Sequence, residues 1–332
     1  MAQKTIDERA ELVKTSFDQI KTELAKVIVG QIELINHIYV CLLCGGHALI
    51  EGVPGLGKTL LVKSLGKVVN LNYSRIQFTP DLMPADILGT NIVNQDEKGN
   101  RYFEFYQGPI FGQVILADEI NRATPKTQSA LLEAMQEEAV TIFGKKYQLE
   151  PPFIVLATQN PLEMEGTYPL PEAQIDRFFF KLKIDYPSVE QISEIMDKTT
   201  EDYQANLDQT VDAKTILEMK SIVREVPIAS HVKDYAIRLV LSTHPDKGTR
   251  IKVVQDFVRY GASPRGVQSL ILASKVMALL SGRYHVSLDD IRAIAKPSLR
   301  HRIILNLRGE AEGIDVDHII NDLLAGVPQK TR

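Results

Sequence analysis

Apolar positions at helical intervals dominate the first part of the chain. Thr5 and Glu8 have the spacing of a capping box, and the apolar residues behind them recur every three or four positions: Ala10, Val13, Phe17, Ile20, Leu24 and Val27. This pattern predicts an amphipathic helix that ends within 27–31. A second, more apolar helix is expected to run to Cys44, because two glycines follow it.

Short apolar runs then alternate with helical patterns. The first predicts a strand at 47–51, followed by a glycine-rich loop at 52–57 and a helix at 59–69. The other runs that predict strands are 75–79, 113–118, 153–158 and 178–184. Nearly continuous apolar runs are typical of strands buried on both faces of a parallel sheet. Their alternation with helices predicts a three-layer α/β domain.

Two β-rich segments interrupt this alternation, and each has a glycine in its central turn. The predicted strands and turns are 90–93, 98–100 and 102–105 in one segment, and 140–143, 144–146 and 147–149 in the other. Glycine-centred turns between β-rich runs predict hairpins.

The pattern changes after Pro187. Strand signals disappear, helical periodicity continues over 188–324, and a Gly-Val-Pro sequence at 326–328 ends the last helix. We therefore place a domain boundary here. The segment 1–187 is expected to hold the N-terminal helices and the α/β core, and 188–332 an all-helical second domain.

Composition agrees with two ordinary globular domains. The chain has 332 residues, of which 44% are hydrophobic and 24% charged. A net charge of -4 argues against a general nucleic-acid binder, although it leaves a local basic patch open. No run of 18 apolar residues occurs, and residues 1–14 lack the apolar centre of a signal peptide, so we expect a cytoplasmic protein.

The two cysteines, Cys41 and Cys44, have C-x-x-C spacing, which is compatible with a redox pair. They also lie in an apolar helical run, where i and i+3 share one face, and this favours a simple core role. The seven histidines show no metal-ligand spacing, and no arrangement typical of acyl transfer is present.

The loop after the first strand carries the strongest chemical signal. Residues 52–59, Gly-Val-Pro-Gly-Leu-Gly-Lys-Thr, match the P-loop pattern G-x-x-x-x-G-K-[ST] between a strand and a helix. Glycines let backbone N–H groups surround phosphates, and the helix N-terminus adds positive potential. Lys58 would contact the β- and γ-phosphates, and Thr59 would offer its hydroxyl to Mg²⁺. The alternative is a glycine-rich turn that binds nothing.

The strand at 113–118 ends in two acidic residues. Asp118 would hold Mg²⁺ through water, and Glu119 would polarise an attacking water molecule. The alternative for this pair is helix capping, which the P-loop upstream disfavours.

Four further residues are candidates for contact with phosphate. Asn160 follows the next apolar strand, where it could orient water or simply form an Asn-Pro turn. Arg177 could be an arginine finger or a solvated side chain. Arg265 lies in the first turn of a helix that Ser-Pro begins, where it could bind phosphate or face solvent. Arg122 could contact a neighbouring subunit or lie on the surface.

Taken in order, these motifs resemble the MoxR family of AAA+ ATPases, to which magnesium chelatase motor subunits are close. The segments that carry the resemblance are 29–31, 52–59, 116–122, 158–161, 170–178 and 263–266. The resemblance extends from about Val27 to the last helices and implies a P-loop NTPase (AAA+) core with a five-stranded parallel sheet, the two hairpins, and an all-helical lid.

The resemblance also assigns roles and ligands, ATP and Mg²⁺. It implies that nucleotide is bound by Val29, Gly30, Gly52, Pro54, Gly55, Leu56, Gly57, Lys58, Thr59, Leu60 and Arg265. Thr59 and Asp118 would hold the metal. Glu119 would activate water, Asn160 would be sensor 1, Arg177 the finger and Arg265 sensor 2. Ring assembly, expected to be hexameric, and a partner with a von Willebrand factor A domain are implied as well.

Three functions follow as hypotheses. The first is a chaperone-like remodeller of partner proteins or metal-cofactor assembly, in which ATP lies between core and lid and hydrolysis rotates one against the other. The second is a DNA-directed, helicase-like motor. The positive charges of Lys145 and Lys146, expected at a hairpin tip, support it slightly. The third is a nucleotide-gated scaffold, which an intact Glu119 disfavours.

Overall fold

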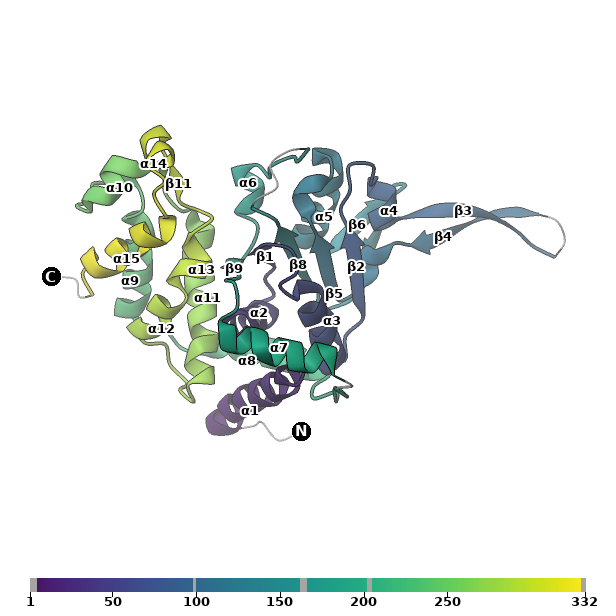
Figure 1. Cartoon of the computed structure of the whole chain (residues 1–332), viewed down its shortest axis with the longest axis horizontal. Coiled ribbons are helices and arrows are strands. Elements are labelled where there is room, and N and C mark those ends of the chain that lie inside the picture. The colour runs from purple at the N-terminus through teal and green to yellow at the C-terminus, as the bar shows by residue number, and fades with distance from the viewer. Residues whose placement is uncertain (1–4, 98–99, 162–165, 202–204, 330–332) are drawn as a thin grey trace.

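The computed structural model describes residues 5–97, 100–161, 166–201 and 205–329 (Figure 1). Its first two helices confirm the predicted pattern. α1 (Ile6–Ala25) begins with the capping box, in which Glu8 N donates to Thr5 Oγ1 at 3.3 Å and Thr5 N donates to Glu8 Oε2 at 2.7 Å. α2 (Ile32–Cys44) ends at Gly45, whose φ of +67° lies in the left-handed region that favours glycine.

The two thiols of α2 belong to the apolar core. Cys41 is buried, Cys44 is partly exposed, and both are free. Burial raises the pKa of each thiol, so that both keep their protons at neutral pH. This chemistry supports the core role and not the redox role.

The predicted strands form one parallel sheet in the order β2-β5-β8-β1-β9. Its members are β1 (Ala48–Glu51), β2 (Tyr73–Gln77), β5 (Val114–Asp118), β8 (Ile154–Gln159) and β9 (Phe180–Lys183). Successive residues of β5 enter two different apolar clusters, one shared with α3 (Lys58–Val68) and the other with α5 (Pro125–Glu137). The sheet is therefore buried on both faces, and the three-layer prediction is confirmed.

Both predicted hairpins are present. The longer pairs β3 (Gly89–Gln95) with β4 (Arg101–Gln107) after a short helix, α4 (Pro84–Leu88), and it projects far from the core (Figure 1). Part of its predicted turn, Lys98 and Gly99, lies outside the described residues. The shorter hairpin pairs β6 (Ala139–Ile142) with β7 (Lys145–Gln148).

Helices follow β9, as predicted. They are α7 (Val189–Thr200), α8 (Ala213–Glu225), α9 (Ser230–Leu241), α10 (Lys252–Phe257), α11 (Pro264–Leu280), α12 (Leu288–Ala293), α13 (Ala295–Leu299), α14 (Leu307–Ala311) and α15 (Val316–Gly326). A short ladder of β10 (Val258–Tyr260) and β11 (Ile304–Leu305) interrupts them, which the helical prediction missed because such brief strands leave no periodic signal. None of the described helices is long and apolar enough to cross a membrane.

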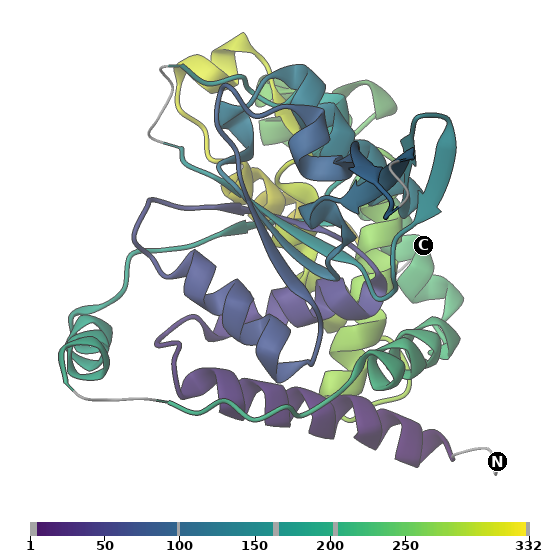
Figure 2. The ribbon, with the colours of Figure 1, turned by 90° about the vertical axis from the view of Figure 1, so that its right-hand side faces the viewer.

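The helices after residue 187 do not form a single group. α9 to α15 lie together as the lid, whereas α7 and α8 lie beside the core (Figure 1). Figure 2 shows α7 at the margin of the body. The division at residue 187 stays a prediction.

A buried histidine joins the start of β1 to the neighbouring strand β8 and to α5. His47 is 5% exposed; its Nδ1 accepts from Val155 N at 3.0 Å, so its protonated Nε2 donates to Met135 O, also at 3.0 Å. Both ring nitrogens are thus used in the neutral state. Burial lowers the pKa of His47 to about 4.

This histidine predicts acid sensitivity of the fold. Between its ordinary pKa of 6.5 and about 4, the unfolded chain binds a proton at His47 that the folded chain does not. The free energy of unfolding should therefore fall as pH falls through this window, by about 2 kcal/mol at pH 5 from this residue. Urea unfolding between pH 5 and 7.5 measures the slope.

The control is His47→Asn, whose side-chain oxygen can still accept from Val155 N but does not titrate. Other buried histidines such as His301 titrate in both proteins, so only the difference in slope between variant and wild type is informative. Equal slopes would contradict the prediction.

Candidate functional site

The P-loop joins β1, which lies between β8 and β9 in the sheet, to α3. Gly55 and Gly57 have φ of +84° and +73°, values that strain any residue with a Cβ, although a Cβ at either position would meet no atom within 4 Å. Gly57 is the N-cap of α3, and no side chain caps this helix. Its first N–H groups are thus available to an anion, and the open space above the loop fits a phosphate chain.

Lys58 turns back over the same loop. Its Nζ donates to Gly52 O at 2.5 Å and to Val53 O at 3.2 Å. Burial lowers the pKa of this ammonium, while Asp118 and Glu119 act in the opposite direction. The lysine is therefore placed between the phosphate cradle and the acidic pair, and Thr59 follows it in the first turn of α3.

The acidic pair lies at the carboxyl end of β5, next to β8. Thr158, which is 1% exposed, donates to Asp118 Oδ1 at 2.7 Å and accepts from Glu119 N at 2.8 Å. Glu119 has φ of 59° and ψ of 49°, a left-handed conformation that is unfavourable for a residue with a side chain. Thr158 thus orients one carboxylate and stabilises the backbone of the other, a role that sequence analysis missed.

Side chains from β2 also reach the acidic pair. Arg75 Nη2 donates to Asp118 Oδ2 at 2.6 Å, and Gln77 Nε2 donates to Glu119 Oε2 at 3.0 Å. Arg122 Nε lies 3.2 Å from the same Glu119 oxygen. Sequence analysis missed Arg75 and Gln77, because their contacts depend on β2 being the neighbour of β5, with Gln77 in register with Asp118.

Asn160 lies at the same edge of the sheet. It follows β8, the strand between β5 and β1, and it is 8% exposed. Gly52 N donates to the carbonyl of the preceding residue, Gln159, at 3.2 Å, which ties the P-loop to this strand end. The structure therefore brings Asn160, the acidic pair and the P-loop together.

A cavity of about 250 Å³ continues from the P-loop. It is lined by the predicted Val29, Gly30, Gly55, Leu56, Gly57 and Leu60, and also by α7. From α7 come Gln191, Ile195 and Lys198, which sequence analysis did not select because the path of α7 is set by tertiary structure. Size, apolar lining and position next to a phosphate cradle suit a nucleoside. Pro54 is exposed on the loop outside this lining.

The two candidate arginines lie at the opposite edge of the sheet. Arg177 and Arg265 line a different cavity, of about 350 Å³, together with His47, which precedes β1. The P-loop follows β1. The structure therefore does not bring Arg177 or Arg265 to the P-loop of the same chain.

Because the Thr158 hydroxyl makes two hydrogen bonds at the acidic pair, its removal should lower the free energy of unfolding. Thr158→Val preserves shape but leaves the Glu119 N–H and an Asp118 oxygen without this partner, so the free energy of unfolding should fall by about 1–3 kcal/mol. Thr158→Ser keeps both hydrogen bonds and loses one methyl group, worth about 1 kcal/mol. Urea unfolding compares the two, and a valine variant at least as stable as the serine variant would contradict this account.

Comparisons with known proteins agree with this geometry. Residues 47–180 match the family described as "ATPase family associated with various cellular activities (AAA)", and 250–323 match the AAA lid domain. The chain is 42% identical to Chaperone MoxR1 of Mycobacterium tuberculosis, over 92% of this chain and 80% of that protein. It is 41% identical to YeaC of Bacillus subtilis, over 91% of each, and 30% identical to MoxR of Methylorubrum extorquens, over 86% and 87%.

A solved structure extends the likeness to the whole fold. The crystal structure of a candidate ATPase from Cytophaga hutchinsonii superposes with a TM-score of 0.90 at 43% identity, over 97% of both chains. A likeness at this level includes the lid as well as the core. The chain therefore belongs to the MoxR family of AAA+ ATPases, and it is a nucleotide-binding ATPase.

Proposed function

We propose that this ATPase works as a ring in which each nucleotide site is completed by the neighbouring subunit. One observation carries the proposal: the P-loop lies at the carboxyl edge of the sheet, whereas Arg177 and Arg265 lie at its amino edge. An arginine stabilises a transferring phosphoryl group only within hydrogen-bonding distance. The phosphate that these arginines serve must then belong to another copy. Such head-to-tail contact closes into a ring, and the family resemblance supports six subunits.

Within one interface the residues would divide the work. Lys58 binds the β- and γ-phosphates, and Glu119 polarises the attacking water, which Asn160 helps to orient. Thr59 and Asp118 would hold Mg²⁺, which neutralises phosphate charge when bound. Val29, Gly30 and the α7 side chains surround the base. Arg177 and Arg265 of the neighbour supply the positive charge that the transition state needs.

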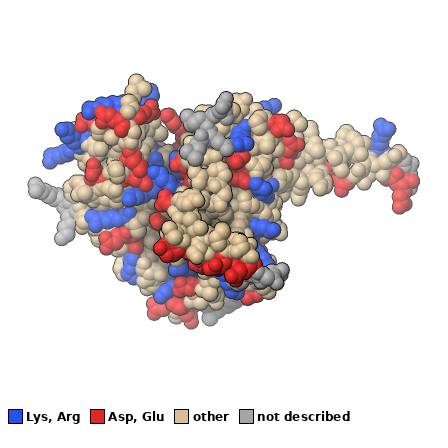
Figure 3. Space-filling view, in the orientation of Figure 1, with Lys and Arg blue, Asp and Glu red and all other residues tan. Residues whose placement is uncertain are grey.

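The projecting hairpin supports a role in protein remodelling. Val93, Phe103 and Tyr106 are 56%, 75% and 68% exposed along its shaft. Figure 3 shows this shaft largely without charged side chains, so it suits apolar protein segments better than phosphates. One relative is named a chaperone. The resemblance adds a partner with a von Willebrand factor A domain; Lys145 and Lys146 are the basis of the DNA alternative, which these relatives do not support.

Mixing two inactive variants tests the shared site. Arg177→Ala and Glu119→Gln should each lose about 10³–10⁵ in rate, since each removes a group that acts on the transition state. Rings containing both variants should regain activity, because some interfaces pair an intact Glu119 with an intact Arg177. The measurement is ATP hydrolysis after subunit exchange, which energy transfer between labelled chains verifies.

The matched control mixes Glu119→Gln with Lys58→Ala. Both lesions lie on the P-loop side, so every interface keeps a defect and no activity should return. Recovery in the control, or none in the test mixture despite verified exchange, would overturn the shared site.

The dependence of ATPase activity on protein concentration and on added DNA distinguishes a protein remodeller from a DNA-directed motor. For a ring-forming protein remodeller, specific ATPase activity should rise cooperatively with protein concentration and stay unchanged when single- or double-stranded DNA is added. Strong stimulation by DNA would favour the DNA-directed motor instead, and Lys145 and Lys146 would then be mutated first.

A further inference from the structure

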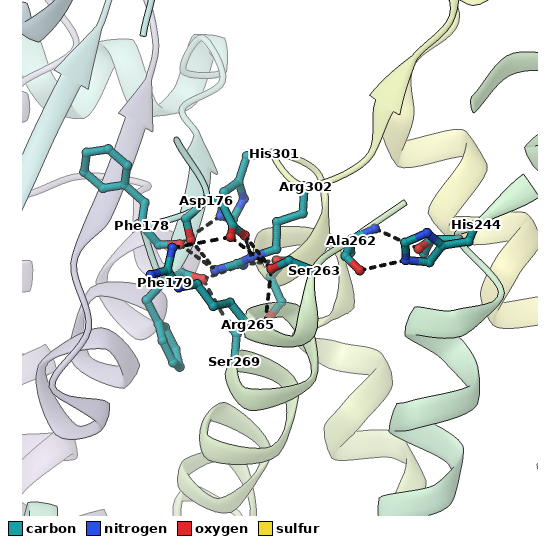
Figure 4. Close-up of polar contacts among 12 residues, drawn as sticks. Asp176, Phe178, Phe179, His244, Ala262, Ser263, Arg265, Ser269, His301 and Arg302 are labelled. Carbon is teal, nitrogen blue, oxygen red and sulfur yellow. Dashed lines mark hydrogen bonds and ion pairs between the residues drawn. The ribbon is translucent and has the colours of Figure 1, made fainter. Parts of the chain in front are cut away.

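A buried arginine of the lid contacts the core where the candidate finger lies. Arg302 follows α13, and its side chain is 3% exposed. Its Nε donates to Asp176 Oδ1 at 2.9 Å, its Nη2 to Phe178 O at 2.7 Å, and its Nη1 to Phe179 O at 3.2 Å (Figure 4). Nη1 also contacts Ser298 O, and Nη2 lies 3.4 Å from Asp176 O. One guanidinium thus contacts the residues on both sides of Arg177.

The carboxylate that Arg302 holds is shared with the helix that bears Arg265. Ser263 Oγ lies 2.9 Å from each oxygen of Asp176, and Arg265 Nη1 lies 3.5 Å from Oδ2. Ser263 is also the N-cap of α11, and it accepts from Arg265 N at 3.2 Å. Asp176 therefore links the backbone before β9 with the first turn of α11, and Arg302 orients this carboxylate from the buried side (Figure 4).

Other lid side chains bind the same short segment, so Arg302 is not its only anchor. Ser269 Oγ donates to Phe179 O and His301 Nε2 to Phe178 O, both at 2.9 Å. The Arg177 side chain donates from Nη1 to Leu132 O at 3.1 Å, and it lines the cavity described above. The backbone that carries Arg177 is thus held firmly while its side chain has room to reach outward.

A buried ion pair is weak evidence for stability, because desolvation offsets much of the attraction. Apolar contacts and neutral hydrogen bonds join lid and core without it. What a planar guanidinium adds is direction: its fixed donors bind one carboxylate and several carbonyls at once, which a lysine cannot do. Burial lowers the pKa of Arg302 to about 10, so the group stays charged at neutral pH.

We propose that Arg302 is a positioning residue for ATP hydrolysis. By holding Asp176 and the carbonyls that flank Arg177, it sets Arg177 and Arg265 in one arrangement that faces the nucleotide of the neighbouring subunit. This inference rests on the shared site proposed above. Arg302 itself is buried and acts through these groups.

The first test is Arg302→Lys, which keeps the positive charge and loses the planar set of hydrogen-bond donors. We expect kcat to fall about 10²-fold, the effect of misplacing a catalytic group by roughly 1 Å, while KM for ATP stays near that of wild type because the variant's own P-loop is intact. Arg300→Lys is the matched control. Arg300 lies two residues away on the same lid and binds Asp317 at 2.9 Å and Lys181 O at 3.2 Å, without contact to Asp176. Its kcat should stay close to wild type.

Mixed rings then locate the defect. Arg302→Lys chains mixed with Lys58→Ala chains should regain activity. The substitution at position 58 affects the P-loop side of an interface and the substitution at position 302 affects the arginine side, so some interfaces are intact on both sides. Mixed with Arg177→Ala chains they should not, because both lesions lie on the arginine side. A general folding defect would not discriminate between the two mixtures. Wild-type kcat in Arg302→Lys, or equal recovery in both mixtures, would overturn the inference.

Two further measurements keep the result unambiguous. Arg177→Ala mixed with Lys58→Ala is the reference: if this pair fails to recover, the shared site itself is wrong, whereas recovery there without the Arg302 pattern refutes only the role of Arg302. Should Arg302→Lys lower Tm below the assay temperature, Ser263→Ala replaces it. This variant removes the hydrogen bond from Ser263 to Asp176. Its kcat should fall less than that of Arg302→Lys, and its activity should likewise recover with Lys58→Ala chains but not with Arg177→Ala chains.

Discussion

All five strands of the core sheet run in the same direction, and the rest of the molecule depends on this constraint. Parallel pairing gathers every strand end at one edge and every strand start at the other. The P-loop and Asn160 follow strands and the acidic pair lies at the end of β5, whereas His47 and Arg177 precede strands. β1 has four residues and spans about 13 Å, so no side chain bridges the two edges. In the proposed shared site, one chain would therefore carry both sets of residues without being able to join them.

The carboxyl edge is a dense arrangement of charges in which each group already has a partner. Asp118 is held by Arg75 and Thr158, and Glu119 by Gln77 and Arg122. Such pairing is what makes two carboxylates and a left-handed backbone tolerable at the end of a buried strand. A metal–phosphate ligand at this edge would have to compete with the existing partners, so its binding would be coupled to the orientation of the acidic pair.

Sequence reasoning succeeded wherever the signal is local. The capping box at Thr5, the glycines of the P-loop and the apolar run of β5 each express their structure within a few residues. It failed where partners meet through strand order or domain packing: Gln77 reaches Glu119 only because β2 lies beside β5. The local prediction for Arg265, a first-turn position behind a Ser-Pro cap, was correct for the helix. It could not say which edge of the sheet that helix would meet, because this depends on contacts between residues nearly 90 positions apart.

These contacts also bear on how the motor moves. Ser269, Arg300, His301 and Arg302 of the lid all donate to backbone carbonyls between Phe178 and Lys181, at or just before β9. A joint made of side chains bound to the backbone of a core strand resists rotation, since turning the lid would break several buried hydrogen bonds at once. The expected rotation of the lid against the core would therefore have to break these bonds, and it stays a prediction. In the proposed ring, movement is then easier at the contact between one chain's arginine edge and the next chain's P-loop. The same holds for α7, which borders the cavity beside the P-loop and buries none of its own residues.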